Sequence, residues 1–404
     1  MKRIVLVCSA LLLLSLSASA QPDRTLPLKT VINNALDNSI RQSMRLALML
    51  KDRPGLLPRS TDSTGTLVTC TSKWWTSGFF PGTLWYLFEY SKNDSLKRFA
   101  EEFTRRVTNE QFTTDNHDVG FMINNSFGNA YRITGDTMYR SALLNASRSL
   151  MTRFNPVVGA TRSWNTDKNN RQWQFAVIID NMMNLELLLR SADEFNEPTF
   201  KTAALSHADK TLQHHFRPDH SSYHVVSYDT ITGLPHAKQT AQGFLDSSSW
   251  SRGQAWGLYG FTMMYRLTKE KRYLDQAQHI ADFILHHPNL PADKIPYWDF
   301  NAPNIPNTYR DASAGAIICS ALIELSGYVS PKKMMEYRGV AERQIRTLSS
   351  AQFKNISKRN APFILDHSVG SIPHRSEIDV PLTYADYYFV ESLLRMRALT
   401  NIKQ

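Results

Sequence analysis

The chain has 404 residues, 42% hydrophobic and 20% charged, a composition that indicates a globular protein and excludes a disordered one. The formal net charge of +10 comes without a dense lysine or arginine run, so we expect no nucleic-acid partner; an acidic ligand fits the charge, but charge alone favours an ordinary basic surface. Only Cys70 and Cys319 lie after residue 20, which excludes a disulfide framework but leaves one bridge possible.

The first twenty residues have the pattern of a secretory signal peptide. Lys2 and Arg3 precede an apolar run, and residues 18–20 form the small-residue cleavage site Ala-Ser-Ala. Removing Lys2 and Arg3 lowers the formal charge from +10 to +8. No later stretch is long and apolar enough to span a bilayer. We therefore predict that residues 21–404 form a single domain that is periplasmic or secreted and makes no membrane contact.

A weak internal repeat organises the rest of the chain. In chain order, six segments open with glycine or a polar residue and continue as strongly apolar, aromatic-rich helices, starting at Gly78, Asp118, Asp180, Arg252, Asp311 and Asp386. Other stretches carry their apolar residues on one helical stripe only, at residues 28–50, 95–107, 138–154, 199–216, 271–287 and 332–350. The repeat predicts six inner and six outer helices.

A helix that is apolar on nearly every side must be covered, whereas a helix with one apolar stripe can face water. The alternation therefore predicts concentric layers. We expect an all-α (α/α)6 barrel, with an open right-handed solenoid as the alternative. The exception is residues 222–233, where β-branched and aromatic residues crowd before Thr232-Gly233 and predict a small β-hairpin in a loop.

In such a barrel the inner helices run in one direction, so their first residues gather at one mouth, which the helix N-termini bias toward anions. Aspartate is a favoured N-cap, and we assign capping alone to Asp311 and Asp386. Asp118 and Asp180 have asparagine-rich surroundings and open neighbouring inner helices. If they lie close together, each raises the cost of ionising the other, so one can hold a proton near neutral pH. They are our candidate general acid and its positioning partner.

Tryptophans gather near the predicted helix starts, and their flat faces suit the C–H faces of sugars, although tryptophan is also common in helical cores. The expected sugar contacts are Trp75, Trp164, Trp250 and Trp256. The histidines between residues 207 and 224 lack the usual zinc spacings, and nucleophile elbows, phosphate loops and dinucleotide motifs are absent. We therefore expect no metal and no cofactor, and proton transfer by carboxylates remains as the chemistry.

Several segments resemble one known family. They are NHDVGF (116–121), IDNMMNL (179–185), YHVV (223–226), SWSRGQAW (249–256), PYWDF (296–300) and DYYFVE (386–391). Their order and spacing are similar to those of the unsaturated glucuronyl hydrolases of glycoside hydrolase family 88, and the likeness runs through nearly the whole mature chain. IDNMMNL and SWSRGQAW are the most specific pieces.

The resemblance implies a hydrolase that removes a 4,5-unsaturated uronic acid from the non-reducing end of oligosaccharides left by a lyase. It implies hydration of the C4=C5 enol ether, in which Asp180 protonates C4 and activates the water that attacks C5. Asp118 matches a second essential carboxylate that helps to keep Asp180 protonated. Arg252 matches the partner of the uronate carboxylate. The other matched substrate contacts are His224, Gln242, Trp75 and Trp256.

Residues 368–375 form a predicted loop that can reach the next sugar. Ser368, Ser371, His374 and Arg375 lie in this loop, and His374 and Arg375 would accept a sulfate, which favours glycosaminoglycan disaccharides as substrates. An ordinary exposed loop with polar residues is an equal alternative. Rival functions are an unsaturated rhamnogalacturonyl hydrolase acting on pectin fragments, a polysaccharide lyase and a periplasmic oligosaccharide-binding protein. The paired aspartates argue against the last two. We expect a monomer or a weak dimer.

Overall fold

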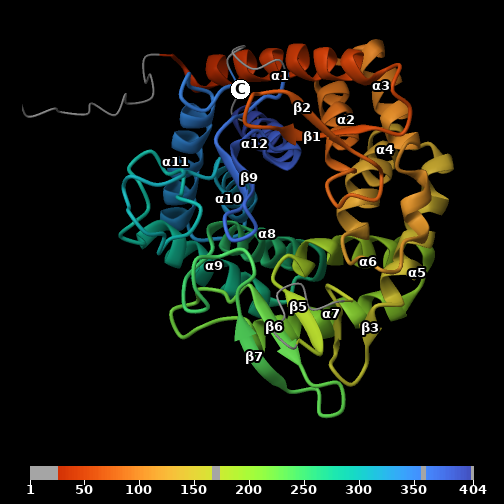
Figure 1. Ribbon diagram of the computed structural model, residues 1–404, viewed down its shortest axis with the longest axis vertical. Coiled ribbons are helices and arrows are strands. Elements are labelled where there is room, and N and C mark those ends of the chain that lie inside the picture. Colours follow the sequence, from red (N-terminus) through yellow and green to blue (C-terminus); the bar gives the residue numbers. More distant parts are fainter. Residues whose placement is uncertain (1–25, 166–172, 356–360, 402–404) are drawn as a thin grey trace, which may run out of the picture.

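The computed structural model describes residues 26–165, 173–355 and 361–401, and the expected signal peptide lies outside these ranges. Within the described residues, six long helices form an outer layer (Figure 1): α1 (Leu28–Leu50), α3 (Asp94–Arg105), α5 (Arg140–Met151), α7 (Pro198–His214), α9 (Lys271–His286) and α11 (Pro331–Leu348). Each lies within a few residues of the stripe that predicted it. Local signals set the starts: Asn93 caps α3, and proline opens α7 and α11.

The described inner layer consists of α2 (Phe79–Ser91), the π-helix η2 (Gly120–Gly128) continued by α4 (Asn129–Thr134), α6 (Asn181–Phe195), α8 (Ser251–Thr268), α10 (Ala312–Leu325) and α12 (Thr383–Asn401). Each inner helix packs against the next, and α12 packs against α2, which closes the ring. Each outer helix packs on an inner one. The (α/α)6 barrel is therefore confirmed, and the open solenoid is excluded because its first and last repeats would not meet.

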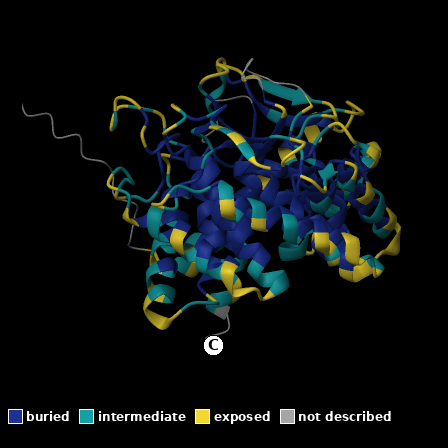
Figure 2. Ribbon diagram, turned by 90° about the horizontal axis from the view of Figure 1, so that it is seen from below, coloured by how far each residue is buried: buried dark blue, intermediate teal, exposed yellow. Residues whose placement is uncertain are grey.

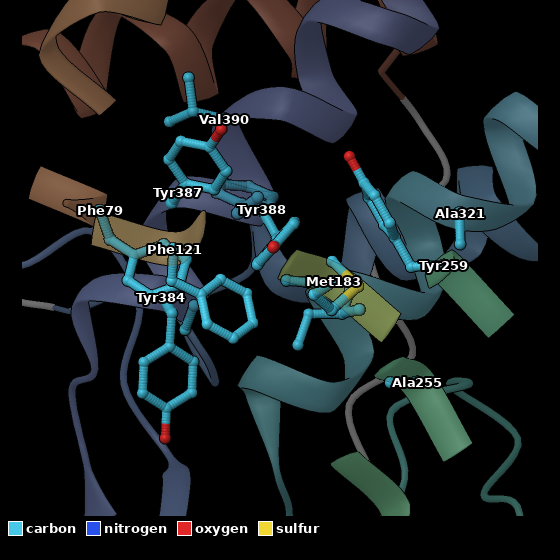
Figure 3. Packing of buried hydrophobic residues seen from close by; sticks show 14 of the residues in the cluster. Phe79, Phe121, Met183, Ala255, Tyr259, Ala321, Tyr384, Tyr387, Tyr388 and Val390 are labelled. Carbon is cyan, nitrogen blue, oxygen red and sulfur yellow. The ribbon is translucent and has the colours of Figure 1, made fainter. Parts of the chain in front are cut away.

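Aromatic side chains fill the barrel axis (Figure 3). The ring centroids of Phe79 and Phe121 lie 5.2 Å apart, those of Phe121 and Trp256 5.2 Å, and those of Trp256 and Tyr388 5.5 Å. Figure 2 shows the buried inner ribbons surrounded by helices with exposed outer faces. The axis is thus a packed core, and any ligand must bind at one of its ends.

Gly120 brings the second inner helix close to the third. A Cβ atom at this position would lie 2.5 Å from Oδ1 of Asn184, which is too close for a real contact. Instead, the same oxygen accepts the N–H of Phe121 at 2.9 Å. Because η2 is fixed against α6 in this way, the residues just before the two helices meet at the same mouth. The π-helical geometry of η2 was not expected, and such segments often accompany functional sites.

Short strands lie in the loops between the helices. β6 (Val225–Tyr228) pairs antiparallel with β7 (Pro235–Gln239) and with β5 (Phe175–Ile178). The predicted hairpin is therefore present, but it extends to residue 239 and belongs to a three-stranded sheet. The sequence did not reveal three other antiparallel pairs, β1 (Leu57–Thr61) with β2 (Leu67–Cys70), β3 (Phe154–Asn155) with β4 (Ala160–Thr161), and β8 (Ser368–Ser371) with β9 (Ser376–Val380). Strands this short contain too few residues to show an alternation of apolar and polar side chains in the sequence.

The structure also bears on the possible disulfide bridge and on membrane-spanning helices. Cys70 and Cys319 are both free thiols, so they form no bridge. In the described part of the chain, no helix has both the length and the apolar character needed to cross a bilayer.

Candidate active site

A cavity of about 870 Å³ opens at the mouth where the inner helices begin. Its walls come from residues at or just before those helix starts, including Trp75 before α2, Asp118 before η2, Asp180 before α6, Arg252 on α8 and Tyr384 on α12. The volume falls within the usual range for small-ligand sites. Both aspartates therefore line one cavity, as the barrel topology predicts.

Asp180 lies between the end of β5 and the start of α6. The preceding residue, Ile179, donates its N–H to the carbonyl of His224 at 3.0 Å, which anchors this junction to the sheet. Asp180 is 8% exposed, and burial raises its pKa from 3.8 to about 7. The charge of Arg252 and the indole N–H of Trp256 oppose that rise. The carboxyl group can therefore both donate and accept a proton near neutral pH.

The cause of this raised pKa differs from the expected one. We expected the charge of Asp118 to hinder the ionisation of Asp180, but the dominant cause is loss of solvation. Asp180 loses solvation because it is the N-cap of α6 at the bottom of the cavity, where the packed barrel axis excludes water from one side of its carboxyl group.

His224 presents a fixed ring edge to Asp180. Its Nδ1 atom accepts the backbone N–H groups of Ala241 at 3.1 Å and Gln242 at 3.2 Å, so the neutral ring carries its proton on Nε2. Nε2 lies 3.9 Å from Oδ2 of Asp180. The ring is buried, and its centroid lies 4.4 Å from that of Trp250. His224 therefore lies next to Asp180, buried beneath the cavity wall.

Asp118 is linked to the surroundings of Asp180 through Ser163. Oδ1 of Asp118 lies 3.2 Å from Nε2 of His117, whose Nδ1 lies 2.9 Å from the Ser163 carbonyl. The hydroxyl of Ser163 donates to Oδ1 of Asn181 at 2.8 Å, directly after Asp180. A chain of contacts therefore joins the neighbours of both carboxyl groups.

Arg153, just after α5, supports the cavity wall near Asp118 from its buried side. The sequence did not reveal this role. Its guanidinium donates to the carbonyls of Thr114 at 2.7 Å, Arg162 at 2.8 Å and Ser163 at 3.1 Å. It therefore connects the segment before Asp118 with the segment before β5. An arginine at the end of an amphipathic outer helix has the sequence signature of a solvent-facing charge, so only the fold reveals this contact.

Arg252 is more enclosed than expected for the partner of a uronate carboxylate. It lines the cavity but is only 1% exposed, and it donates to the carbonyls of Gly370, at 2.7 Å, and Val369. Its guanidinium also lies 3.4 Å from the carboxylate of Asp311. Asp311 caps α10 through the N–H of Ser313, as predicted, but it also pairs with Arg252, so capping is not its only role.

The tryptophans divide into two groups. Trp75 and Trp164 line the cavity. Trp256 is 0% exposed, so the prediction that its face stacks on a sugar is wrong, and Trp250, 3% exposed, has little surface left for the predicted sugar contact. Trp250 precedes α8 and packs on the ring of His224. Trp256, in the first turns of α8, packs in the barrel axis, and its indole N–H lowers the pKa of Asp180 without forming a hydrogen bond of normal geometry. Its contribution is electrostatic rather than a stacking surface.

The β8–β9 hairpin supplies only part of the expected sugar contacts. Gln242 lines the cavity and donates to the carbonyl of Gly370 at 3.1 Å. Ser371 and His374 also line it, and Oγ of Ser371 lies 2.7 Å from Nδ1 of His374. Ser368 is 0% exposed, so its predicted contact with the sugar is wrong. Arg375 is exposed and is not among the residues that line the cavity, and its contact stays a prediction. Ser368 is enclosed within β8, while Arg375 lies in the solvent-exposed turn that follows it.

Two residues of the last inner helix have contacts that the sequence did not indicate. Tyr384 lines the cavity, its ring centroid lies 5.0 Å from that of Trp75, and its buried hydroxyl has no hydrogen-bond partner among the described residues. Asp386 accepts the N–H groups of Ile364 and Leu365, both at 2.9 Å, so it holds the segment before β8, and the prediction of capping alone is wrong. Burial raises the pKa of Asp386 to about 7.

The cavity thus combines a buried carboxyl group with a pKa near 7, a second carboxylate, a fixed histidine and aromatic walls. Within the described ranges, no three histidine, cysteine, aspartate or glutamate side chains cluster as metal ligands. An (α/α)6 barrel with such a mouth defines a carbohydrate-active enzyme that works by acid and base catalysis.

Comparison with known proteins agrees with this class. The model of Glycosyl Hydrolase Family 88 matches residues 57–397. The chain is 44% identical to the unsaturated glucuronyl hydrolase of Formosa agariphila over 81% of both chains. It is 31% identical to the unsaturated chondroitin disaccharide hydrolase of Streptococcus pneumoniae over 91% of this chain and 92% of the relative. The crystal structure of an unsaturated glucuronyl hydrolase specific for heparin matches 93% of this chain and 98% of its own, with a TM-score of 0.86 and 46% identity. The chain belongs to glycoside hydrolase family 88.

Proposed function

We propose that the protein removes a 4,5-unsaturated uronic acid from the non-reducing end of glycosaminoglycan oligosaccharides produced by a lyase. The observation that carries this proposal is Asp180, a carboxyl group whose pKa is raised to about 7 at the bottom of a sugar-sized cavity that it shares with Asp118. The relatives named for unsaturated glucuronyl, chondroitin-disaccharide and heparin-specific activity support the substrate class.

The chemistry is hydration of an enol ether. Protonated Asp180 transfers its proton to C4, which leaves an oxocarbenium-like centre at C5. The resulting carboxylate stabilises this positive charge and then takes a proton from the water that attacks C5, so Asp180 regains its proton. The hydrated sugar is a hemiketal at C5, and its opening breaks the C5–O5 ring bond and leaves a hemiacetal at C1. Collapse of this hemiacetal to an aldehyde breaks the C1–O bond and releases the rest of the saccharide. No covalent enzyme intermediate is needed, in contrast to retaining glycosidases.

The cavity walls fit an acidic sugar. The N-termini of the inner helices and the charge of Arg252 favour a carboxylate at the mouth, even though Arg252 is already engaged by β8 and Asp311. Trp75 and Trp164 offer apolar ring faces. Ser371 and His374 are the groups on the β8–β9 hairpin that can contact the neighbouring sugar or its sulfate.

The test uses unsaturated disaccharides from chondroitin, hyaluronan, heparin and pectin, with loss of the ultraviolet absorbance of the conjugated double bond as the readout. We expect turnover of the glycosaminoglycan disaccharides and a decrease in kcat of about a thousandfold in Asp180→Asn. Asp193→Asn, at an exposed position on the same helix, is the matched control and should keep its activity. Fastest turnover of the pectin fragment would favour the rhamnogalacturonyl alternative. Wild-type turnover by Asp180→Asn would remove this residue from the mechanism.

We further propose that residues 1–20 direct export and that the mature enzyme is periplasmic or secreted. The support is the basic start, apolar run and small-residue site of this segment. Cell fractionation with N-terminal sequencing tests the proposal. A mature chain beginning near Gln21 outside the cytoplasm is the expected result, and an intact Met1 in the cytoplasm would contradict it.

A further inference from the structure

Two buried histidines lie beside the two carboxyl groups of the cavity, and the backbone holds their rings in opposite ways. For His224, two backbone N–H groups donate to Nδ1, so the edge that faces Asp180 is an N–H. For His117, the partner of Nδ1 is the carbonyl oxygen of Ser163, at 2.9 Å. A carbonyl oxygen can only accept, so Nδ1 of His117 carries a proton.

This arrangement constrains the contact between His117 and Asp118. In a neutral ring protonated on Nδ1, Nε2 has a lone pair, and it lies 3.2 Å from Oδ1 of Asp118. A lone pair facing an ionised carboxylate at this distance is repulsive, and His117 is only 2% exposed, so water screens the contact poorly. One additional proton makes the contact attractive. The pair is then an imidazolium with a carboxylate or an imidazole with a carboxylic acid, and it is neutral in both forms.

We propose that His117 is a positioning residue that shares one proton with Asp118 and so prevents Asp118 from placing a second negative charge opposite Asp180. The inference deepens the proposed function, on which it rests, because it assigns a role to a cavity-lining residue for which the proposed mechanism names none.

The charged groups around the pair are consistent with its neutrality. Among the described residues, the charged or titratable groups that face it from the surrounding elements, or across the cavity, are Lys73, Glu110, Asp115, Arg153, Arg162, Asp180, Arg252, His374 and Glu377. Arg153 donates to the same Ser163 carbonyl as His117, which places a fixed cation behind the ring. Such a cation disfavours an imidazolium and moves the shared proton toward Asp118. The total charge of the pair is unaffected by that choice.

The pH dependence of kcat/KM tests the proposal with His117→Asn and His117→Gln. The asparagine amide can still donate to the Ser163 carbonyl, and the glutamine amide reaches toward Asp118, but neither variant can supply the shared proton. Asp118 then ionises, and its charge favours the protonated form of Asp180. We expect the decline of kcat/KM at alkaline pH to move upward by at least about half a pH unit in both variants. Reduced activity at every pH with an unmoved decline indicates a purely structural role and overturns the proposal.

A second measurement keeps the test valid if both variants lose the shape of the cavity. The wild-type protein and Asp118→Asn are compared, both with ¹⁵N-labelled histidine. The Nε2 resonance of His117 should differ between the two proteins, and an identical resonance overturns the proposal. Asp180→Asn separates this inference from the proposed function. If Asp180→Asn is inactive while the His117 variants keep the wild-type profile, only the proton sharing is wrong. If Asp180→Asn is fully active, the proposed function and this inference both fail.

Discussion

Oδ2 of Asp180 and Nε2 of His224 lie 3.9 Å apart, and two backbone donors on the far side of the ring fix the facing edge of His224 as an N–H. A carboxyl group that gives up its proton during the reaction therefore has a donor directed at its newly formed charge. At 3.9 Å the contact is longer than a hydrogen bond, so His224 stabilises the carboxylate as a nearby dipole.

The first prediction concerns the pH profile of the wild-type enzyme. Because burial raises the pKa of Asp180 to about 7, the acid is protonated below this value and ionised above it. We expect kcat/KM to be maintained below neutral pH and to decline as pH rises through about 7. Steady-state rates with a chondroitin disaccharide between pH 4 and pH 9 measure this. Activity that rises through the same range would contradict the assignment of Asp180 as the acid.

The second prediction concerns the indole N–H of Trp256, which lowers the pKa of Asp180 by favouring its ionised form. Trp256→Phe removes that donor and keeps an aromatic ring, so the alkaline decline of kcat/KM should move to higher pH by about half a unit to one unit. Trp85→Phe is the control, because the indole of Trp85 bonds to Thr104 between α2 and α3 and should leave the profile in place. A downward shift in Trp256→Phe would show that the sign of this contact is wrong.

The third prediction is that the active-site acid destabilises the fold. Folded Asp180 binds its proton more tightly than the unfolded chain does, so its ionisation costs the folded state stability as pH rises from about 4 to about 7. Asp180→Asn removes this cost, and the raised pKa corresponds to at most about 4 kcal/mol at pH 8. Denaturant unfolding of both proteins at pH 4 and pH 8 measures the difference. Equal gains in the free energy of unfolding at the two pH values would contradict the prediction.

The fourth prediction concerns Arg153, whose guanidinium bonds to carbonyls of the segment before Asp118 and of the segment before β5. Arg153→Ala leaves these buried carbonyls without their charged donor and should lower the free energy of unfolding by about 3 kcal/mol. It should also lower kcat, because the walls around Asp118 and Asp180 lose their common anchor. Arg148→Ala, at an exposed position on α5, should stay within about 0.5 kcal/mol of wild type. Similar losses of unfolding free energy in Arg153→Ala and Arg148→Ala would show that the contacts of Arg153 with the three carbonyls are unimportant.

Features that depend on neighbours along the chain could be predicted well. The outer helices follow single apolar stripes, so the predicted segment 28–50 coincides with α1 and 271–287 nearly coincides with α9. The capping of α10 by Asp311 likewise depends on a residue only two positions away. Strands as short as β3 and β4 escaped prediction, because too few residues carry their pattern.

The amino-acid sequence by itself determined the layered barrel, the mouth that collects the helix starts and the choice of Asp118 and Asp180, since helical periodicity and motif order are local properties. Only the tertiary structure decided how each group is used. It buried Asp180, turned Trp256 into the axis, enclosed Arg252 against Asp311, and set His117 and His224 with opposite ring edges. The physical reason is that solvation and proton affinity depend on groups brought together from distant parts of the chain.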